Sequence, residues 1–180
     1  RTVLTKRVPP LLPGGHFLDN AQRVFDTVPF WKALGNSLIV SGTVATSTVF
    51  FCTLAGYAFA KLRFRGSNGL LAFVVATMAV PTQLGVVPLF ILMSKLGWTG
   101  TTWSVIVPSL VTAFGVFFMR QYLVDAVPDE LIEAARIDGC SQIRIVWHVV
   151  APAARPAAAI LWLFTFMATW TDFFWPLIAL

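Results

Sequence analysis

The sequence predicts an all-α bundle of helices that span a membrane. Hydrophobic residues make up 57% of the chain and charged residues only 12%, and the mean hydropathy is +0.78. A soluble domain has about 25% charged residues, so this chain has too few charges to cover a water-facing surface. A helix needs roughly 20 apolar residues to cross a bilayer. Apolar stretches of about this length alternate with polar segments along the chain.

The first two spans are expected at about residues 36–60 and 69–93. The first contains no charged residue, and its small residues, such as Gly56, permit close packing between helices. The second contains Pro81, which lacks a backbone N–H and therefore favours a kinked or partly unwound helix.

The third and fourth spans are expected at about residues 101–119 and 157–180. Pro108 interrupts the third, and the fourth is rich in aromatic residues and carries a single charge, Asp172. The polar stretch between them, residues 120–156, holds most of the acidic residues and is expected to be a loop.

The distribution of basic residues predicts the orientation of these spans. Lysine and arginine next to a span favour the cytoplasmic side. Residues 61–68 and 120–156 hold seven of the basic residues and the opposite side holds six, or three once Arg1, Lys6 and Arg7, which lie far from a span, are left out. We therefore expect both segments to face the cytoplasm and the turn around Lys95 to face outward. Residues 1–31 contain no apolar run long enough to cross a bilayer and are expected to be an external segment.

The polar stretch has the features of two short helices joined by a turn. Pro128 suits the first turn of a helix, and the acidic residues after it complement the helix dipole. Gly139 is a natural stop because glycine adopts the left-handed conformation without steric cost. Ser141 is a good cap for a second short helix.

One face of the first short helix suits a protein partner. Ala134 and Ala135 leave it nearly flat, so a partner can approach the backbone closely, and Glu133 places a negative charge beside them. A Glu-Ala-Ala triplet also occurs on ordinary surface helices. The spacing to Gly139 and Pro152, together with the flanking spans, favours a docking loop.

This stretch resembles the signature loop of ABC importer permeases, which reads Glu-Ala-Ala, three residues, Gly, nine residues, Ile, any residue and Leu-Pro. Val149 and Ala151 replace the isoleucine and the leucine. The Asp138–Gly139 pair and Trp175 followed by Pro-Leu resemble the carbohydrate-uptake branch, with its maltose-type and glycerol-3-phosphate-type permeases. The residues expected to form the ATPase-docking loop are Glu133, Ala134, Ala135, Asp138, Gly139 and Pro152.

The resemblance implies a type I ABC importer fold with six helices, in which residues 32–180 form the transmembrane domain and hold the second to fifth helices. The chain is therefore expected to be a piece of a longer protein, with the first and last helices missing. It would be a permease subunit in the bacterial plasma membrane, forming the pathway for a sugar or polyol-type solute.

The same resemblance implies the partners and cofactors. A separate ABC ATPase subunit would bind ATP and Mg, while this chain would hold no cofactor, metal or catalytic residue. A second homologous permease, an extracytoplasmic substrate-binding protein and the lipid bilayer would complete the assembly, with no role for nucleic acid. The sequence itself contains no Walker-type phosphate loop and no paired histidines at metal spacing.

Two other classes of protein stay open on the sequence. A secondary transporter needs charged residues inside the membrane for ion coupling, and only Asp172 qualifies, unless it lies at the outer interface. A membrane scaffold would not need the docking loop. Single hydroxyl residues in spans often bond only their own backbone. The residues expected to line a pathway are Thr77, Gln83, Thr112, Thr169 and Asp172.

Overall fold

The computed structural model describes Gln22, Phe25 and residues 29–180, and all regular structure in these residues is helical. The predicted all-α architecture is therefore confirmed. The expected external segment at residues 1–31 lies almost wholly outside the described residues. The chain divides into two compact units, Arg1–Ser37 and Leu38–Leu180. The second contains every element discussed below except the first residues of the helix Phe30–Lys61.

Helix α2 (Phe30–Lys61) is the longest, at 32 residues. Its buried positions recur every three or four residues, for example at Val44, Thr48 and Cys52, which places them on one face of the helix. The helix continues to Lys61, one residue beyond the expected span, because this lysine has partners described below that hold the last turn.

The second apolar stretch is broken. Helix α3 (Ser67–Thr77) is followed by a 3₁₀ turn, η1 (Thr82–Gly85), and by α4 (Val86–Lys95), and the two halves are bent by 92°. Pro81 lies at the break, as expected. The 11 residues of α3 extend only about 16 Å, so neither half crosses a 30 Å hydrocarbon layer alone.

The third stretch is also broken. A short helix, α5 (Trp103–Ile106), runs into the 3₁₀ turn η2 (Val107–Ser109). Helix α6 (Ala113–Ala126) follows, and Thr112 caps its start because the Thr112 hydroxyl accepts a 3.0 Å hydrogen bond from the N–H of Gly115. Helix α6 runs past the expected end at residue 119 because its core-facing side continues to Leu123, which is fully buried one turn later.

The fourth stretch differs most from expectation. Helix α8 (Gln142–Ile145), the π-helical turn η3 (Val146–Val150) and α9 (Ala151–Thr171) form one continuous helix, which starts well before residue 157. Pro152 has no N–H to offer to the carbonyl four residues earlier, and a π-helical turn at that point accommodates such a missing bond.

The continuous helix ends at Asp172, which adopts an extended conformation. Its carboxylate accepts a 3.1 Å hydrogen bond from the N–H of Phe174 at the start of the short helix α10 (Phe174–Ala179). The expected span at residues 157–180 is therefore not one helix. A short polar helix, α7 (Asp129–Ile137), precedes α8 and completes the fold.

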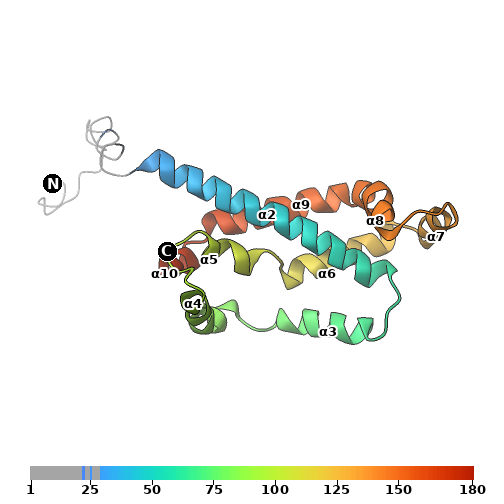
Figure 1. Cartoon of the computed structure of the whole chain (residues 1–180), viewed down its shortest axis with the longest axis horizontal. Helices are drawn as coiled ribbons and strands as arrows, with labels where there is room; N and C mark the ends of the chain where they lie inside the picture. The colour runs from blue at the N-terminus through green and yellow to red at the C-terminus, as the bar shows by residue number, and fades with distance from the viewer. Residues whose placement is uncertain (1–21, 23–24, 26–28) are drawn as a thin grey trace, which may run out of the picture. The chain divides into compact units, whose positions relative to one another are not determined.

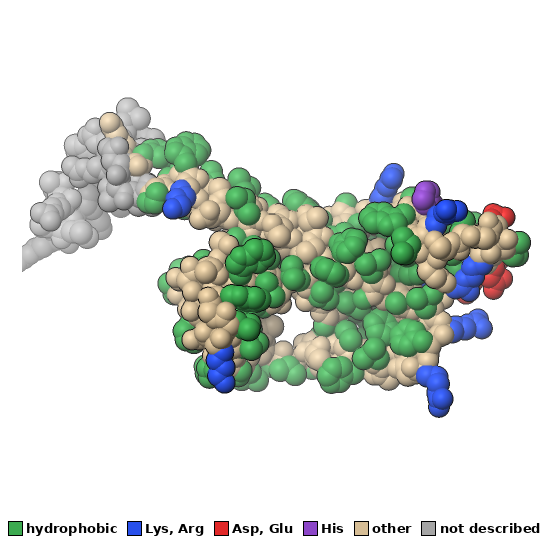
Figure 2. Space-filling view, in the orientation of Figure 1, with side chains coloured by type: hydrophobic (Ala, Val, Ile, Leu, Met, Phe, Trp, Pro, Cys, Tyr) green, Lys and Arg blue, Asp and Glu red, His purple; other side chains and the backbone are tan. Residues whose placement is uncertain are grey.

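Within Leu38–Leu180, α7 and α8 lie at one end of the long helices and α4, α5 and α10 lie at the other (Figure 1). Charged side chains gather at the end with α7 and α8, whereas hydrophobic side chains cover the flanks (Figure 2). Among the residues that the structure describes, three helices are long and apolar enough to cross a membrane, or four if the bent pair is one span. This pattern suits contact with lipid along the flanks and with water at the ends.

The main hydrophobic core joins the long helices to the two short ones. Met119 and Leu123 from α6 pack with Leu161 from α9, and the same cluster includes Ile132 from α7 and Ile145 from α8. The short helices therefore pack against the core of the bundle.

Candidate functional site

The turn between α7 and α8 is a defined helix C-cap. Gly139 has a φ of +76°, in the left-handed region. Its N–H donates a 3.0 Å hydrogen bond to the carbonyl of Arg136, and the N–H of Cys140 donates a 2.9 Å bond to the carbonyl of Ala135. These two bonds form a Schellman motif, which satisfies carbonyls at the end of α7. The predicted stop at Gly139 is confirmed.

The start of each short helix also follows from local chemistry. Pro128 precedes α7, and Asp129 and Glu130 occupy its first turn, where acidic side chains complement the helix dipole. Ser141 caps α8, because its hydroxyl accepts a 3.4 Å hydrogen bond from the N–H of Arg144. The loop is therefore a helix–turn–helix elbow, as the sequence predicts.

The expected docking residues divide between the surface and the packed side of the elbow. Glu133 and Ala134 are exposed, whereas Ala135 is half-buried and packs against the core. Asp138 is the last residue before the glycine turn. Pro152 lies in the first turn of α9, so it belongs to the long helix rather than to the elbow.

The elbow also exposes large apolar side chains that the sequence analysis missed. Leu131 is 52% exposed, Ile143 is 72% exposed and Ile137 is 87% exposed. Helical spacing from the buried Ile132 indicates that Ile137 lies on the opposite side of α7, and this signal was available in the sequence. We call the exposed set the docking surface; it consists of Leu131, Glu133, Ala134, Ile137 and Ile143.

The charges around the elbow leave Glu133 available. Within residues 29–180, no ion pair to Glu133 is present. Its side chain borders a polar hollow of about 380 Å³ between α7, α8 and the segment after α2. Arg63 and Arg136 line the same hollow. The lining of the hollow therefore includes both an exposed carboxylate and two arginine side chains.

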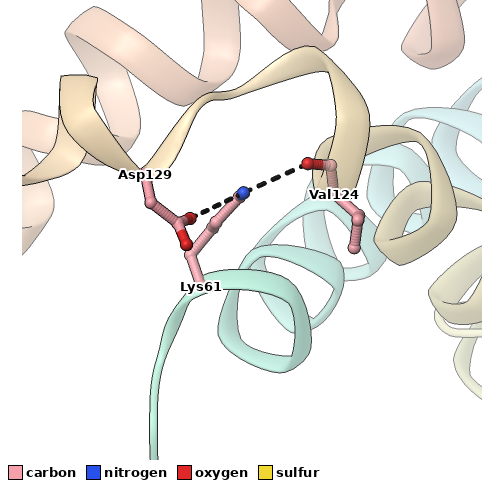
Figure 3. A network of polar contacts seen from close by, with 3 residues as sticks. All are labelled: Lys61, Val124 and Asp129. Atoms are coloured by element: carbon pink, nitrogen blue, oxygen red, sulfur yellow. Dashed lines mark hydrogen bonds and ion pairs between the residues drawn. The ribbon is translucent and has the colours of Figure 1, made fainter.

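Lys61, the last residue of α2, lies under the start of the elbow. Its Nζ is 2.8 Å from Oδ1 of Asp129 and donates a 3.2 Å hydrogen bond to the carbonyl of Val124 (Figure 3). The lysine side chain is only 6% exposed. The hydrogen bond and the charge of Lys61 hold the pKa of Asp129 below its ordinary value.

A second contact joins α2 to the other short helix. The hydroxyl of Tyr57 donates a 2.9 Å hydrogen bond to Oε1 of Gln142, the first residue of α8. Tyr57 is itself buried in the main core. Neither Tyr57 nor Lys61 stands out as a site residue in the sequence, because their partners come from a distant segment of the chain.

Four of the five expected pathway residues line two adjoining hollows. One hollow, of about 500 Å³, includes Gln83, and the other, of about 700 Å³, includes Thr112 and Thr169. Asp172 lines both. Figure 2 shows this part of the bundle hollowed, between the segment that joins α3 to α4 and the remaining helices. Thr77 lines neither, and its hydroxyl donates to the carbonyl of its own helix at Val74.

The hollows have a mixed lining of polar and apolar side chains. The broken segments of the second and third apolar stretches supply Thr82, Gln83, Pro108 and Ser109, so polar groups from interrupted helices face the cavity. Asp172 is the sole charged side chain among the lining residues. In the part of the chain that the structure describes, no cluster of three or more His, Cys, Asp or Glu side chains is placed to hold a metal ion.

Comparison with known proteins assigns these features to a family. Residues 52–180 match the sequence profile of the family described as "Binding-protein-dependent transport system inner membrane component". The arabinooligosaccharides transport system permease protein AraQ of Halalkalibacterium halodurans is 35% identical over 164 residues, which are 91% of this chain and 58% of that protein. The sn-glycerol-3-phosphate transport system permease protein UgpE of Escherichia coli is 28% identical over 174 residues, 93% of this chain and 62% of that protein.

The fold agrees with a solved structure. A chain in the crystal structure of a bacterial ABC transporter involved in the import of the acidic polysaccharide alginate matches with a TM-score of 0.84 and 27% identity. The match covers 99% of this chain and 63% of that one. This chain thus spans 58% to 63% of the lengths of these relatives.

Proposed function

Because the chain belongs to the family of inner membrane components of binding-protein-dependent transport systems, we propose that it is a permease subunit of an ABC importer for a sugar or polyol-type solute. Its broken helices form half of a translocation pathway, and ATP hydrolysis on a separate ATPase subunit drives transport. These 180 residues contain no Walker-type phosphate loop, and in this proposal the energy of ATP hydrolysis reaches the chain through a docking contact.

The single observation that carries this proposal is the elbow of α7 and α8. It combines an exposed surface, at the charged end of the bundle, with a buried side that shares the core of the long helices. A loop that only connected two spans would not need to pack into the main core, as Ile132 and Ile145 do. The packing of one side of the elbow on the core, with the other side exposed, would let a partner act on the spans.

The docking surface has the chemistry of a protein interface. Ile137 and Ile143 provide apolar area that a partner would bury, and burial of apolar area favours association between proteins. Ala134 allows close approach, and Glu133 offers an anionic partner for a basic side chain. The ATPase subunit is the occupant we assign to this surface, with Mg and ATP held on that subunit.

The hollows supply the pathway. Hydroxyl and amide side chains such as Gln83 and Thr112 suit a solute rich in hydroxyl groups, because each can donate and accept hydrogen bonds. Irregular backbone at membrane depth is tolerated where it lines a cavity, and the breaks at Pro81 and Pro108 lie beside these hollows. A second homologous permease would close the open side.

The substrate class follows from the relatives. The arabinooligosaccharide and sn-glycerol-3-phosphate permeases and the alginate importer all handle carbohydrate or polyol derivatives, which supports the same class here. In this proposal an extracytoplasmic binding protein delivers the solute at the end with α4, α5 and α10. The end with α7 and α8 faces the cytoplasm, in keeping with the basic residues there.

Reconstitution of the full-length protein in proteoliposomes, with its partner permease, ATPase and binding protein, tests the proposal. We expect uptake of a labelled oligosaccharide or polyol that requires both ATP inside and the binding protein outside. Uptake driven by an ion gradient without the ATPase would instead identify a secondary transporter and would refute the proposal.

A further inference from the structure

We propose that Tyr57 and Lys61 form a clamp that transmits movement of the two docking helices to α2. Both lie on the last turns of α2, four residues apart, and therefore on the same face. Tyr57 holds the first residue of α8, and Lys61 holds the first residue of α7. This inference rests on the proposed function, because it assigns to named residues the step between ATPase docking and movement of the spans.

Lys61 occupies the joint between α6 and α7. The carbonyl of Val124 would normally accept a hydrogen bond from the N–H four residues later, but that residue is Pro128, which has none. The ammonium group of Lys61 takes this place at 3.2 Å and reaches Asp129 at 2.8 Å. One side chain thus satisfies the end of α6 and holds the start of α7 (Figure 3).

The position of Lys61 explains why a charge is tolerated in a nearly buried place. A buried charge is costly unless it is paired and hydrogen-bonded, and both conditions are met here. Asp129 itself is 68% exposed, and ion pairs with an exposed partner add little to folding stability. The pair is therefore better suited to positioning α7 than to stabilising the fold.

Tyr57 makes the equivalent contact with α8. Its side chain is buried in the core, and its hydroxyl reaches the side-chain amide of Gln142 at 2.9 Å. The glycine turn lies between the two held residues, so the elbow is fixed at the start of each of its helices. A force on the elbow then reaches α2 at two points.

The remainder of α2 can carry such a force to the pathway. At Gly56, directly before Tyr57 in the sequence, an added Cβ would lie 2.8 Å from the backbone nitrogen of Arg120, so α2 and α6 pack backbone to backbone. Further along α2, Val44 lines the larger hollow, about 20 Å from Tyr57 at 1.5 Å per residue. The clamp therefore connects the docking helices to a wall of the pathway through one helix.

The test uses the full-length permease in the reconstituted assembly, with three readouts: ATPase subunit retained on purification, ATP hydrolysis, and solute uptake. The variants are Lys61→Met, Asp129→Asn, the double variant and Tyr57→Phe. Matched controls are Lys95→Met, at the other end of the bundle, and Tyr122→Phe, because the hydroxyl of Tyr122 makes no hydrogen bond within residues 29–180.

The clamp predicts a loss of coupling without a loss of docking. Lys61→Met and Tyr57→Phe should retain the ATPase subunit at the parental level, while solute transported per ATP hydrolysed falls about tenfold, as expected for directly coupled residues. The Lys61→Met and Asp129→Asn effects should be non-additive, because each removes the same contact. The control variants should couple like the parent.

Other outcomes overturn the inference. Parental coupling in both Lys61→Met and Tyr57→Phe, or strictly additive effects in the double variant, would exclude a clamp. Equal losses in retention, hydrolysis and uptake would indicate a merely structural role. If Lys61→Met failed to accumulate in the membrane, Asp129→Asn and Tyr57→Phe would decide alone. Failure of the parental protein to retain an ATPase would instead refute the proposed function and is distinguishable from all of these.

Discussion

The N–H of Cys140 donates a 2.9 Å hydrogen bond to the carbonyl of Ala135, and this bond closes the turn that sets α8 against α7. The bond requires Gly139, the residue before Cys140, to adopt the left-handed conformation. The angle between α7 and α8 therefore depends on the φ angle of Gly139. Substitutions of this residue can distinguish the effect of its backbone conformation from the effect of side-chain size.

The effect of replacing Gly139 should depend on how well the new residue tolerates a positive φ and not on the size of its side chain. No atom lies within 4 Å of a Cβ added there, so a side chain has room, but a β-branched residue at φ +76° is strained by about 1–2 kcal/mol. We expect Gly139→Val to weaken retention of the ATPase subunit and to abolish uptake. Gly139→Asn should remain close to the parent, because asparagine tolerates this conformation. Equal behaviour of the two variants would contradict the turn-based explanation.

Reversal of charge at Glu133 should weaken docking. The loss of one partner in a buried interface charge pair costs about 2–5 kcal/mol, so Glu133→Lys should reduce affinity for the ATPase at least tens-fold. The measurement is binding of the purified ATPase to the permease in nanodiscs. Asp125→Lys, an exposed acid on α6, is the matched control and should bind normally. A loss of similar size in the control would assign the effect to net charge alone.

Substitution of Gln83 should affect the solute rather than the ATPase. Its side chain lines a hollow, and one lost neutral hydrogen bond changes affinity by about 0.5–1.5 kcal/mol, so Gln83→Leu should raise the KM for uptake about 2- to 12-fold. Thr77→Val is the control, because Thr77 bonds only to its own helix. The pathway assignment fails if the Thr77 variant raises the KM as much as the Gln83 variant.

Two glycines on α2 should differ in their effect on stability. At Gly56 an added Cβ meets the backbone of α6, whereas at Gly42 nothing lies within 4 Å. Because backbone cannot move aside as a side chain can, Gly56→Val should destabilise the protein by about 1–3 kcal/mol. Gly42→Val should have little effect. Thermal unfolding in detergent compares the two, and an equal loss of stability would contradict the close packing of α2 on α6.

The local features of the elbow could be predicted from the sequence because they depend on short-range chemistry. The glycine stop, the cap by Ser141 and the acidic first turn of α7 require only neighbouring residues. The break at Pro81 is equally local, although the 92° bend there is not, since it depends on what the two halves pack against.

The tertiary contacts could not be predicted. Lys61 meets Asp129 across 68 positions of sequence, and Tyr57 meets Gln142 across 85, so no periodicity links them. The expected start of the last span at residue 157 was wrong because a helix passes through Pro152 and Pro156 once a π-helical turn precedes them. Thr77, which lies outside the hollows, is the last residue of α3 before the 92° bend, and its hydroxyl bonds to its own helix.

The central claim, that the elbow of α7 and α8 binds the ATPase subunit, is tested most directly by cross-linking in native membranes. A single cysteine is introduced by Ala134→Cys on α7 or, as the control, by Lys95→Cys on α4, in a Cys140→Ser background that removes the half-buried thiol of the elbow. The claim predicts a cross-link between position 134 and the ATPase subunit and none from position 95. A transport-competent protein that cross-linked to the ATPase from position 95 and not from position 134 would contradict it.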